Sequence, residues 1–130
     1  MALPNGGGGY QIGDGNVNEI NFEDYTSVTY TAAAAPLLVS DLVGGIIIYT
    51  AAGANNLQLP TVAALEAVVS SARPNVGFLF SVIATGAGTG TVTTNTGWTI
   101  VGSAAVATTV SGRFAAVKTG DGAWSLYRLS

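Results

Sequence analysis

The sequence predicts an all-β protein, namely a jelly-roll-like antiparallel β-sandwich with an extended N-terminal arm and one short helix. Roughly eight to ten short runs rich in Val, Ile, Thr and aromatic residues are separated by Gly, Pro or Asn turn signals. Only one segment has helical spacing, and 130 residues without an internal linker make one domain. We therefore expect an arm over residues 1–25 and a sandwich domain over residues 26–130, although other Greek-key sandwiches fit the same pattern.

The arm differs in composition from the rest of the chain. Residues 6–9 are all glycine, and a polar, acidic stretch continues to Asp24. Isolated apolar residues in such a stretch are typical of an arm whose side chains enter pockets on another surface, and the alternative is an arm that folds back on its own domain. These residues are Leu3, Tyr10, Ile12, Ile20, Phe22 and Tyr25.

Most of the remaining segments have β character. Strands are expected at residues 27–31, 45–50, 57–59, 77–85, 91–94, 98–101 and 105–109, with a turn at 51–56. The isoleucines at 46–48 lack polar alternation, which indicates burial on both faces. The single helix is expected at 61–72, with Thr61 as N-cap, Val62, Leu65 and Val69 on one face, and an end before Pro74.

The last third of the chain contains a hairpin signal. Residues 111–119 and 123–129 are two β-capable runs around Gly120-Asp121-Gly122, which can supply the positive φ of a tight turn. A hairpin is not stable alone in water, so other strands must cover its apolar groups. We expect the core to assemble around Trp98, Phe114, Trp124, Leu126 and Tyr127.

The composition is poor in charge. Hydrophobic residues make up 48% of the chain and charged residues only 8%, against about 25% charged residues in an average soluble domain. A surface of Gly, Ala, Ser and Thr is weakly protected against self-association, so part of it is expected to be covered by other copies or by a larger partner. The alternative is an uncharged, Thr-rich β surface without a partner.

Charge is also divided along the chain. Residues 1–72 carry six acidic residues and no base, for a net charge of −6, whereas residues 73–130 carry four bases and one acid, for a net charge of +3. This division favours a head-to-tail or arm-exchange contact between subunits, with Arg113, Lys118 and Arg128 as candidate receivers of an acidic arm. Four bases in the whole chain argue against a nucleic-acid partner.

The residue types present leave little room for catalysis. The chain contains no Cys and no His, which excludes His-based or thiolate nucleophiles and metal sites that need them. Asp14, Asn16 and Asn18 match the first three ligand positions of a calcium loop, but Glu19 and Tyr25 replace its required Gly and Glu, so an ordinary loop is the better interpretation. We expect no enzymatic activity, no cofactor and no metal.

Two weaker hypotheses concern the glycine runs and the aromatic residues. Residues 6–9 and 86–90 match neither a P-loop nor a dinucleotide fingerprint, so they are interpreted as flexible or tight turns. Tyr49, Trp98, Trp124 and Tyr127 could line a sugar-binding face, although large aromatic residues in a small sandwich more often form the core. Residues 1–4 lack the basic start of a signal peptide, and no apolar run is long enough to cross a membrane, so synthesis and use in the producer's cytoplasm are expected.

Two stretches resemble a known family. LPNGGGGYQIGDGNVNE near the start and GWTIVGSAAVATTVSGRF…KTGDGAWSLYRL near the end, together with LQLPTVAAL and GFLFSVI, resemble the capsid decoration (cement) proteins of tailed bacteriophages. The resemblance implies a jelly-roll-like protein that assembles as dimers or trimers on the outside of the capsid and links neighbouring major capsid subunits. Similar modules also occur in head-fibre and tail-fibre proteins, which leaves a fibre module that binds host-surface carbohydrate as the alternative.

The sequence therefore predicts a structural protein of the virion that binds the major capsid protein and itself. It is expected on the outer surface of the capsid after synthesis in the host cytoplasm, without nucleic-acid or membrane partners. A weak glycosidase that uses paired acidic residues is a further alternative. The residues expected to contact the capsid or a neighbouring subunit are Leu3, Tyr10, Ile12, Asp14, Glu19, Ile20, Phe22, Glu23 and Asp24.

Overall fold

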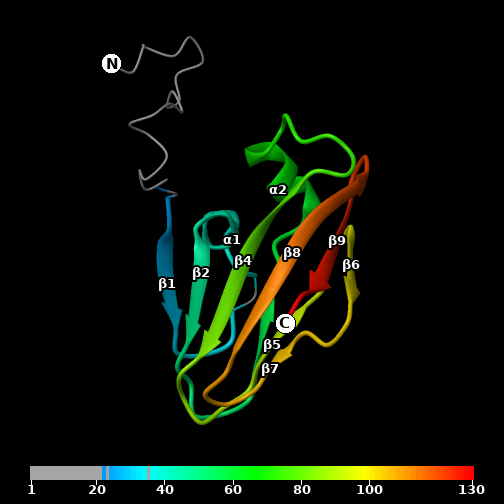
Figure 1. The fold of residues 1–130 in the computed structure, drawn as a ribbon. Coiled ribbons are helices and arrows are strands. Elements are labelled where there is room, and N and C mark those ends of the chain that lie inside the picture. Colours follow the sequence, from blue (N-terminus) through cyan, green and yellow to red (C-terminus); the bar gives the residue numbers. More distant parts are fainter. Residues whose placement is uncertain (1–21, 23, 35) are drawn as a thin grey trace, which may run out of the picture.

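The chain folds mainly into β-strands (Figure 1), as the sequence predicts. The computed structural model describes residue 22, residues 24–34 and residues 36–130. The elements of the described chain are β1 (Thr26–Tyr30), α1 (Val39–Val43), β2 (Gly45–Tyr49), β3 (Asn55–Gln58), α2 (Val62–Val68), β4 (Gly77–Ala84), β5 (Gly90–Thr93), β6 (Trp98–Val101), β7 (Ala105–Val106), β8 (Ser111–Gly120) and β9 (Ala123–Arg128). The division between arm and domain at residues 25 and 26 stays a prediction.

The strands form two mixed sheets. Sheet A has six strands in the order β1-β2-β4-β8-β9-β6, and sheet B has three in the order β3-β5-β7. The pairs β1/β2, β2/β4, β3/β5 and β6/β9 are parallel, whereas β4/β8, β8/β9 and β5/β7 are antiparallel. The expected antiparallel pairing is therefore wrong for four of these seven strand pairs, and the jelly-roll form is not confirmed. Segments such as α1, between β1 and β2, carry the chain back so that the next strand runs in the same direction.

One hydrophobic core lies on the inner side of sheet A. Sheet B and the two helices contribute buried residues to the same cluster as sheet A (Figure 1). Phe114 and Leu126 are completely buried, and Trp124 is 1% exposed. The Trp98 indole N–H donates to the Pro60 carbonyl at 2.7 Å, which satisfies its polar atom inside the core. These four residues form the core as predicted.

The predicted hairpin is confirmed. Strands β8 and β9 pair antiparallel, and a register shift between Lys118 and Gly120 leads into the turn. Gly122 has a φ of 70°, a conformation that glycine adopts without the steric cost of a Cβ. The turn residues that the sequence supplies therefore set the register between β8 and β9.

The helices differ from the prediction in number and length. Thr61 is the N-cap of α2, because its hydroxyl accepts from the Ala64 amide at 3.2 Å, but the helix ends at Val68 rather than at residue 72. The second helix, α1, was not predicted; with five residues it is too short to show a helical period. Its Asp41 carboxylate accepts from the Leu38 amide at 3.0 Å and from the Tyr30 hydroxyl, which ties α1 to β1.

Several strand details also need correction. In β2 only Ile47 is fully buried, whereas Ile46 and Ile48 are half-buried on the opposite face, so burial on both faces is wrong. Asn55 and Asn56, expected in a turn, begin β3, and the strand expected at 105–109 is limited to Ala105 and Val106.

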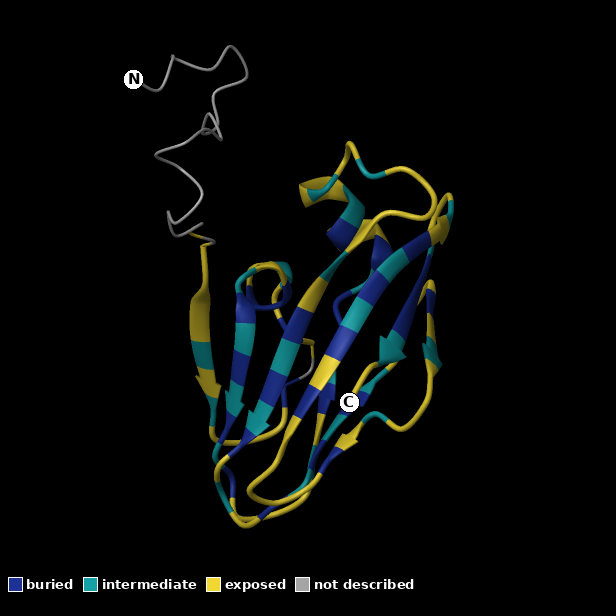
Figure 2. Cartoon of the chain, viewed as in Figure 1, coloured by how far each residue is buried: buried dark blue, intermediate teal, exposed yellow. Residues whose placement is uncertain are grey.

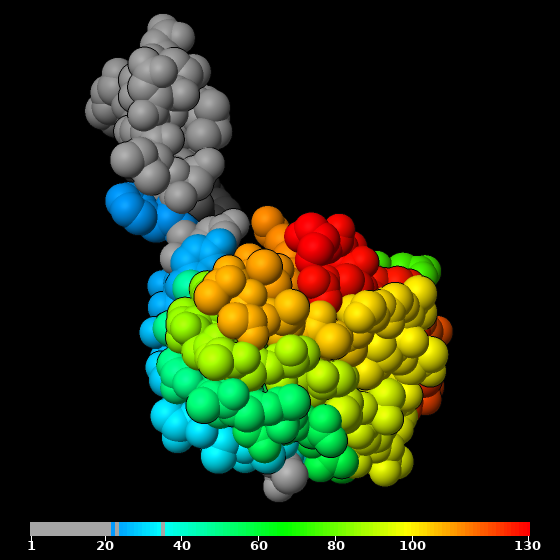
Figure 3. Space-filling view, turned by 90° about the horizontal axis from the view of Figure 1, so that it is seen from below, coloured from blue at the N-terminus to red at the C-terminus, as the bar shows by residue number. Residues whose placement is uncertain are grey.

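The loops that contain Gly53, Gly88 and Thr108 pack together at one end of the molecule (Figure 3). The Thr108 hydroxyl donates to the Ala87 carbonyl at 2.6 Å, and the Gly88 amide donates to the Ala51 carbonyl at 3.1 Å. A Cβ on Gly88 would lie 2.0 Å from the Gly53 carbonyl oxygen, so only glycine fits there. The glycine run at 86–90 therefore has a packing role, in line with its interpretation as a tight turn.

Candidate functional site: the outer face of sheet A

The outer face of sheet A lies opposite to the core, and the strand residues that point outward are mostly exposed or half-buried (Figure 2). Strand register aligns its side chains in rows across the sheet. One row is Ser27, Ile46, Ser81 and Arg113, a second is Thr29, Ile48, Ile83 and Ser111, and a third is Leu79, Ala115, Tyr127 and Val101. Of the strand residues in these rows, Arg113 alone carries a charge.

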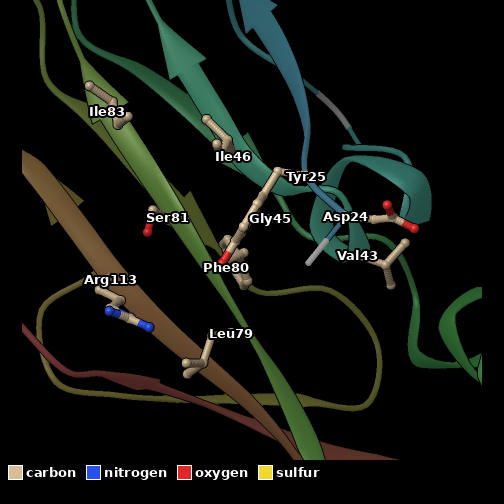
Figure 4. Close-up of a pocket in the computed structure, with 10 residues that line it drawn as sticks. All are labelled: Asp24, Tyr25, Val43, Gly45, Ile46, Leu79, Phe80, Ser81, Ile83 and Arg113. Atoms are coloured by element: carbon tan, nitrogen blue, oxygen red, sulfur yellow. The ribbon is translucent and has the colours of Figure 1, made fainter. Parts of the chain in front are cut away.

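A depression of about 520 Å³ lies on this face, between the start of β1 and the strands β4 and β8 (Figure 4). Tyr25 crosses the beginning of β2, where a Cβ on Gly45 would lie 3.0 Å from the Tyr25 ring. Leu79 is 46% exposed, and Ile83 is half-buried. Figure 4 shows Tyr25 and Arg113 reaching the depression from opposite sides. The result is an open surface lined by apolar and polar groups, with Asp24 and Arg113 as its charged lining residues.

Arg113 is held by its backbone while its side chain stays exposed. Its amide donates to the Ser130 carbonyl at 3.3 Å, and its carbonyl accepts from the Leu129 amide at 2.8 Å. Within the described part of the chain, no ion pair or hydrogen bond engages its guanidinium. A planar guanidinium in this position can bind a carboxylate in a bidentate arrangement.

Lys118 is not available to an acidic arm, so its predicted role is wrong. Its ammonium lies 3.1 Å from a Glu66 carboxylate oxygen and donates to the Ala72 carbonyl at 3.1 Å, with 11% of the side chain exposed. The Trp124 indole N–H donates to the same Glu66 oxygen at 3.2 Å. The hydrogen bond from Lys118, supported by the one from Trp124, lowers the pKa of Glu66. This cluster joins α2 to the hairpin.

Arg128 is likewise engaged inside the molecule, which corrects the second of the three predicted receivers. Its guanidinium donates to the carbonyls of Ser103 at 3.1 Å and Ala105 at 2.9 Å. It also lies over the Phe114 ring, 5.3 Å from the centroid. Of the three cations, Arg113 is the one left for a partner.

Only two of the predicted contact residues fall in the described part of the chain. Phe22 is 83% exposed. Asp24 is exposed and borders both the depression on the outer face and a second one, of about 410 Å³, between β1 and α1. Asp24 and the outer face are thus brought together. The other predicted contacts lie outside the described residues; they are Leu3, Tyr10, Ile12, Asp14, Glu19, Ile20 and Glu23.

Sequence reasoning missed the apolar members of the outer face. Ile46, Leu79 and Ile83 were assigned to strands but not to a surface. The signal that could have found them is alternation in the segment 77–85, where residues 79, 81 and 83 share the face opposite to Phe80 and Val82. Besides its Ser, Thr and Tyr residues, this face leaves large apolar side chains at the surface, with Leu79 46% exposed and Val101 47% exposed.

The other candidate sites carry less support. Tyr49, Trp98 and Trp124 are buried, as expected for core residues, and Tyr127 is half-buried on the outer face. In the described chain, no cluster of three acidic, His or Cys residues could hold a metal ion. The calcium-loop candidate at residues 14–18 lies outside the described residues. Neither of the helices described is long and apolar enough to cross a membrane.

Comparison of the chain with family models, curated proteins and solved structures gave no match.

Proposed function

We propose that the chain is a structural protein of a tailed-bacteriophage virion, a capsid decoration or cement protein that binds the outside of the major capsid lattice and stabilises the head without catalysis. The observation that carries the proposal is the outer face of sheet A, where Ile46, Leu79 and Ile83 line an open depression near the start of β1. Large apolar side chains left on an uncovered sheet face are typical of a surface that another protein covers.

The ionisable groups support a binding role rather than a chemical one. Glu66 and Lys118 form an ion pair, Asp41 accepts hydrogen bonds at the start of α1, and Arg128 donates to backbone carbonyls. Each of these groups stabilises the fold. The domain accordingly serves to present a binding surface and the arm.

The arm is assigned to the capsid lattice. Its apolar residues are spaced along a polar stretch, so each can occupy a separate small pocket, and burial of one such side chain contributes ~1.5–3 kcal/mol. A dimer or trimer presents several arms at once, which raises the effective concentration of the later contacts. The protein is placed on the outer surface of the capsid, after synthesis in the host cytoplasm.

Co-sedimentation with capsids tests this function. The wild-type protein and a variant lacking residues 1–22 are incubated with undecorated capsids of the major capsid protein encoded with this chain, and the bound fraction is measured across protein concentrations. The wild type is expected to saturate the lattice and the truncated protein to stay in solution. Ala63→Lys, at an exposed position of α2, is the control and should bind normally. Normal decoration by the truncated protein would refute the assignment of the arm.

A glycan array run with the same proteins distinguishes a carbohydrate-binding fibre module from a capsid decoration protein. Carbohydrate binding that is lost in Tyr127→Ala, together with no capsid binding by the wild type, would favour the fibre module.

A further inference from the structure

We infer that the outer face of sheet A receives residues 19–24 of a second copy of this chain, so that the base of the arm forms the subunit contact and its distal part remains for the capsid. The allocation of the distal part rests on the proposed function. The subunit contact itself stands on the outer face, on Phe22 and Asp24, and on the amino-acid sequence of residues 19–24.

The exposure of Phe22 shows why the acceptor is a second copy. Tyr25 lies over the beginning of β2, whereas Phe22, three residues earlier, is 83% exposed and makes little contact with its own domain. A large aromatic side chain this exposed, two residues before the Asp24 that borders the uncovered outer face, points to an exchange between copies. The same arrangement in the second copy gives a closed, symmetric pair of contacts.

The charges of the two surfaces are complementary. The segment 19–24 contains Glu19, Glu23 and Asp24 and no base. The rows of the face contain Arg113, whose guanidinium has no partner among the described residues, and no acidic residue, although Asp24 of the same chain also borders the depression near the start of β1. A carboxylate from the neighbouring copy would engage Arg113 and fix the direction of the segment across the sheet.

The spacing of the apolar residues in the segment 19–24, and its length, also match the depression on the outer face. Ile20 and Phe22 are two residues apart, so in an extended conformation their side chains point to the same side, toward Ile46, Leu79 and Ile83 of the acceptor. Six extended residues reach ~20 Å, and the distance from β1 to β8 is three strand spacings, or about 14 Å. The segment is long enough to cross the depression and reach Arg113.

Sedimentation velocity with matched variants tests the contact. Phe22→Asp is expected to weaken self-association at least tenfold, because it places a charge in an apolar contact. Arg113→Glu is expected to weaken it about threefold to tenfold, because it turns an attraction into a repulsion. Arg73→Glu makes the same charge change at an exposed position between α2 and β4, and Val68→Asp adds a charge at an exposed position of α2. Both controls should associate like the wild type.

A mixture of the Phe22→Asp and Arg113→Glu variants distinguishes an arm bound to a second copy from an arm bound to its own domain. The Phe22→Asp protein keeps an intact face and the Arg113→Glu protein keeps an intact arm, so an equimolar mixture is expected to form heterodimers through one unaltered arm–face contact, with an affinity between those of the two variants alone. The mixture would stay monomeric if each arm bound its own domain. A monomeric wild type at micromolar concentration, or unchanged association of both face and arm variants, would overturn the inference.

A shorter truncation separates this inference from the proposed function. Removal of residues 1–14 should leave the oligomer intact and abolish capsid binding. A wild type that associates but does not bind capsids would refute the capsid function alone. A wild type that binds capsids as a monomer would refute the subunit contact alone.

Discussion

Replacement of Gly88 by alanine is expected to destabilise the loop end of the domain. The Cβ of an alanine at this position would lie 2.0 Å from the Gly53 carbonyl oxygen and 2.4 Å from its carbon, whereas ordinary contacts are 3.4–4 Å. Both neighbours are backbone atoms, so they cannot move aside by a change of rotamer. The loop at 86–90 must therefore shift away from the turn that follows β2.

The size of the effect follows from this displacement. Overpacking at a tight site costs about 1–3 kcal/mol. A shift large enough to relieve the contact also lengthens the hydrogen bond from the Gly88 amide to the Ala51 carbonyl, now 3.1 Å, and loss of such a bond costs ~0.5–1.5 kcal/mol. We expect a total of about 2–4 kcal/mol in the free energy of unfolding, or roughly 6–15 °C in Tm for a domain of this size.

Urea and thermal unfolding measure the effect. The fluorescence of Trp98 and Trp124, both in the core, reports the transition. Gly53→Ala is the matched control, because a Cβ there would have no atom within 4 Å, and its effect should stay within about 0.5 kcal/mol. Equal stability of Gly88→Ala and Gly53→Ala would refute the packing role assigned to this glycine.

Three further changes have defined outcomes. Phe114→Ala, at a completely buried position stacked on Phe80, should lower the free energy of unfolding by about 3–5 kcal/mol, as measured by urea denaturation. Thr61→Ala removes the N-cap of α2 and should cost ~0.5–2 kcal/mol, and Thr61→Ser should restore most of it. Burial, followed by the hydrogen bond to Asp41, raises the pKa of Tyr30 to about 12. Because the folded state holds this proton more tightly than the unfolded state, the stability that it contributes is complete below pH ~10 and is lost between pH ~10 and ~12. Tyr30→Phe should remove that part of the alkaline dependence in unfolding curves recorded from pH 8 to pH 12.

Local signals in the sequence were sufficient for some elements. The hairpin depends on Gly120-Asp121-Gly122 and on two flanking runs, and α2 depends on Thr61 followed by apolar residues on one face. In both cases the determinants lie within one short segment. Such elements can be predicted from a single sequence, because turn geometry and capping are properties of neighbouring residues.

The pairing of the strands could not be predicted in the same way. Ile47 pairs with Val82, 35 positions later in the chain, and alternation says nothing about which buried strand lies beside which. The parallel directions of β1, β2 and β4 depend on how the intervening segments cross the sheet. The helix α1 was missed for a related reason, since its stability comes from Asp41 contacting Tyr30 on another element.

The identity of the free cation could have been found from the hairpin register. Residues 113 and 118 are five apart in β8, so their side chains point to opposite faces, and Lys118 shares the inner face with Phe114. Arg128 pairs with Phe114 across the hairpin, and its guanidinium lies over the Phe114 ring on the inner face. Arg113 is therefore the single cation on the outer face.

With Arg113 as its one cation, the outer face gains more from apolar burial than from charge. One exposed ion pair contributes only ~0.2–1 kcal/mol, less than the ~1.5–3 kcal/mol from burial of a side chain such as Phe22. In the proposed contact, affinity would accordingly come from Ile46, Leu79 and Ile83, while Arg113 would select an acidic segment and set its orientation. The segment that fits these two requirements has apolar residues with acidic neighbours, which is the composition of residues 19–24 of the chain itself.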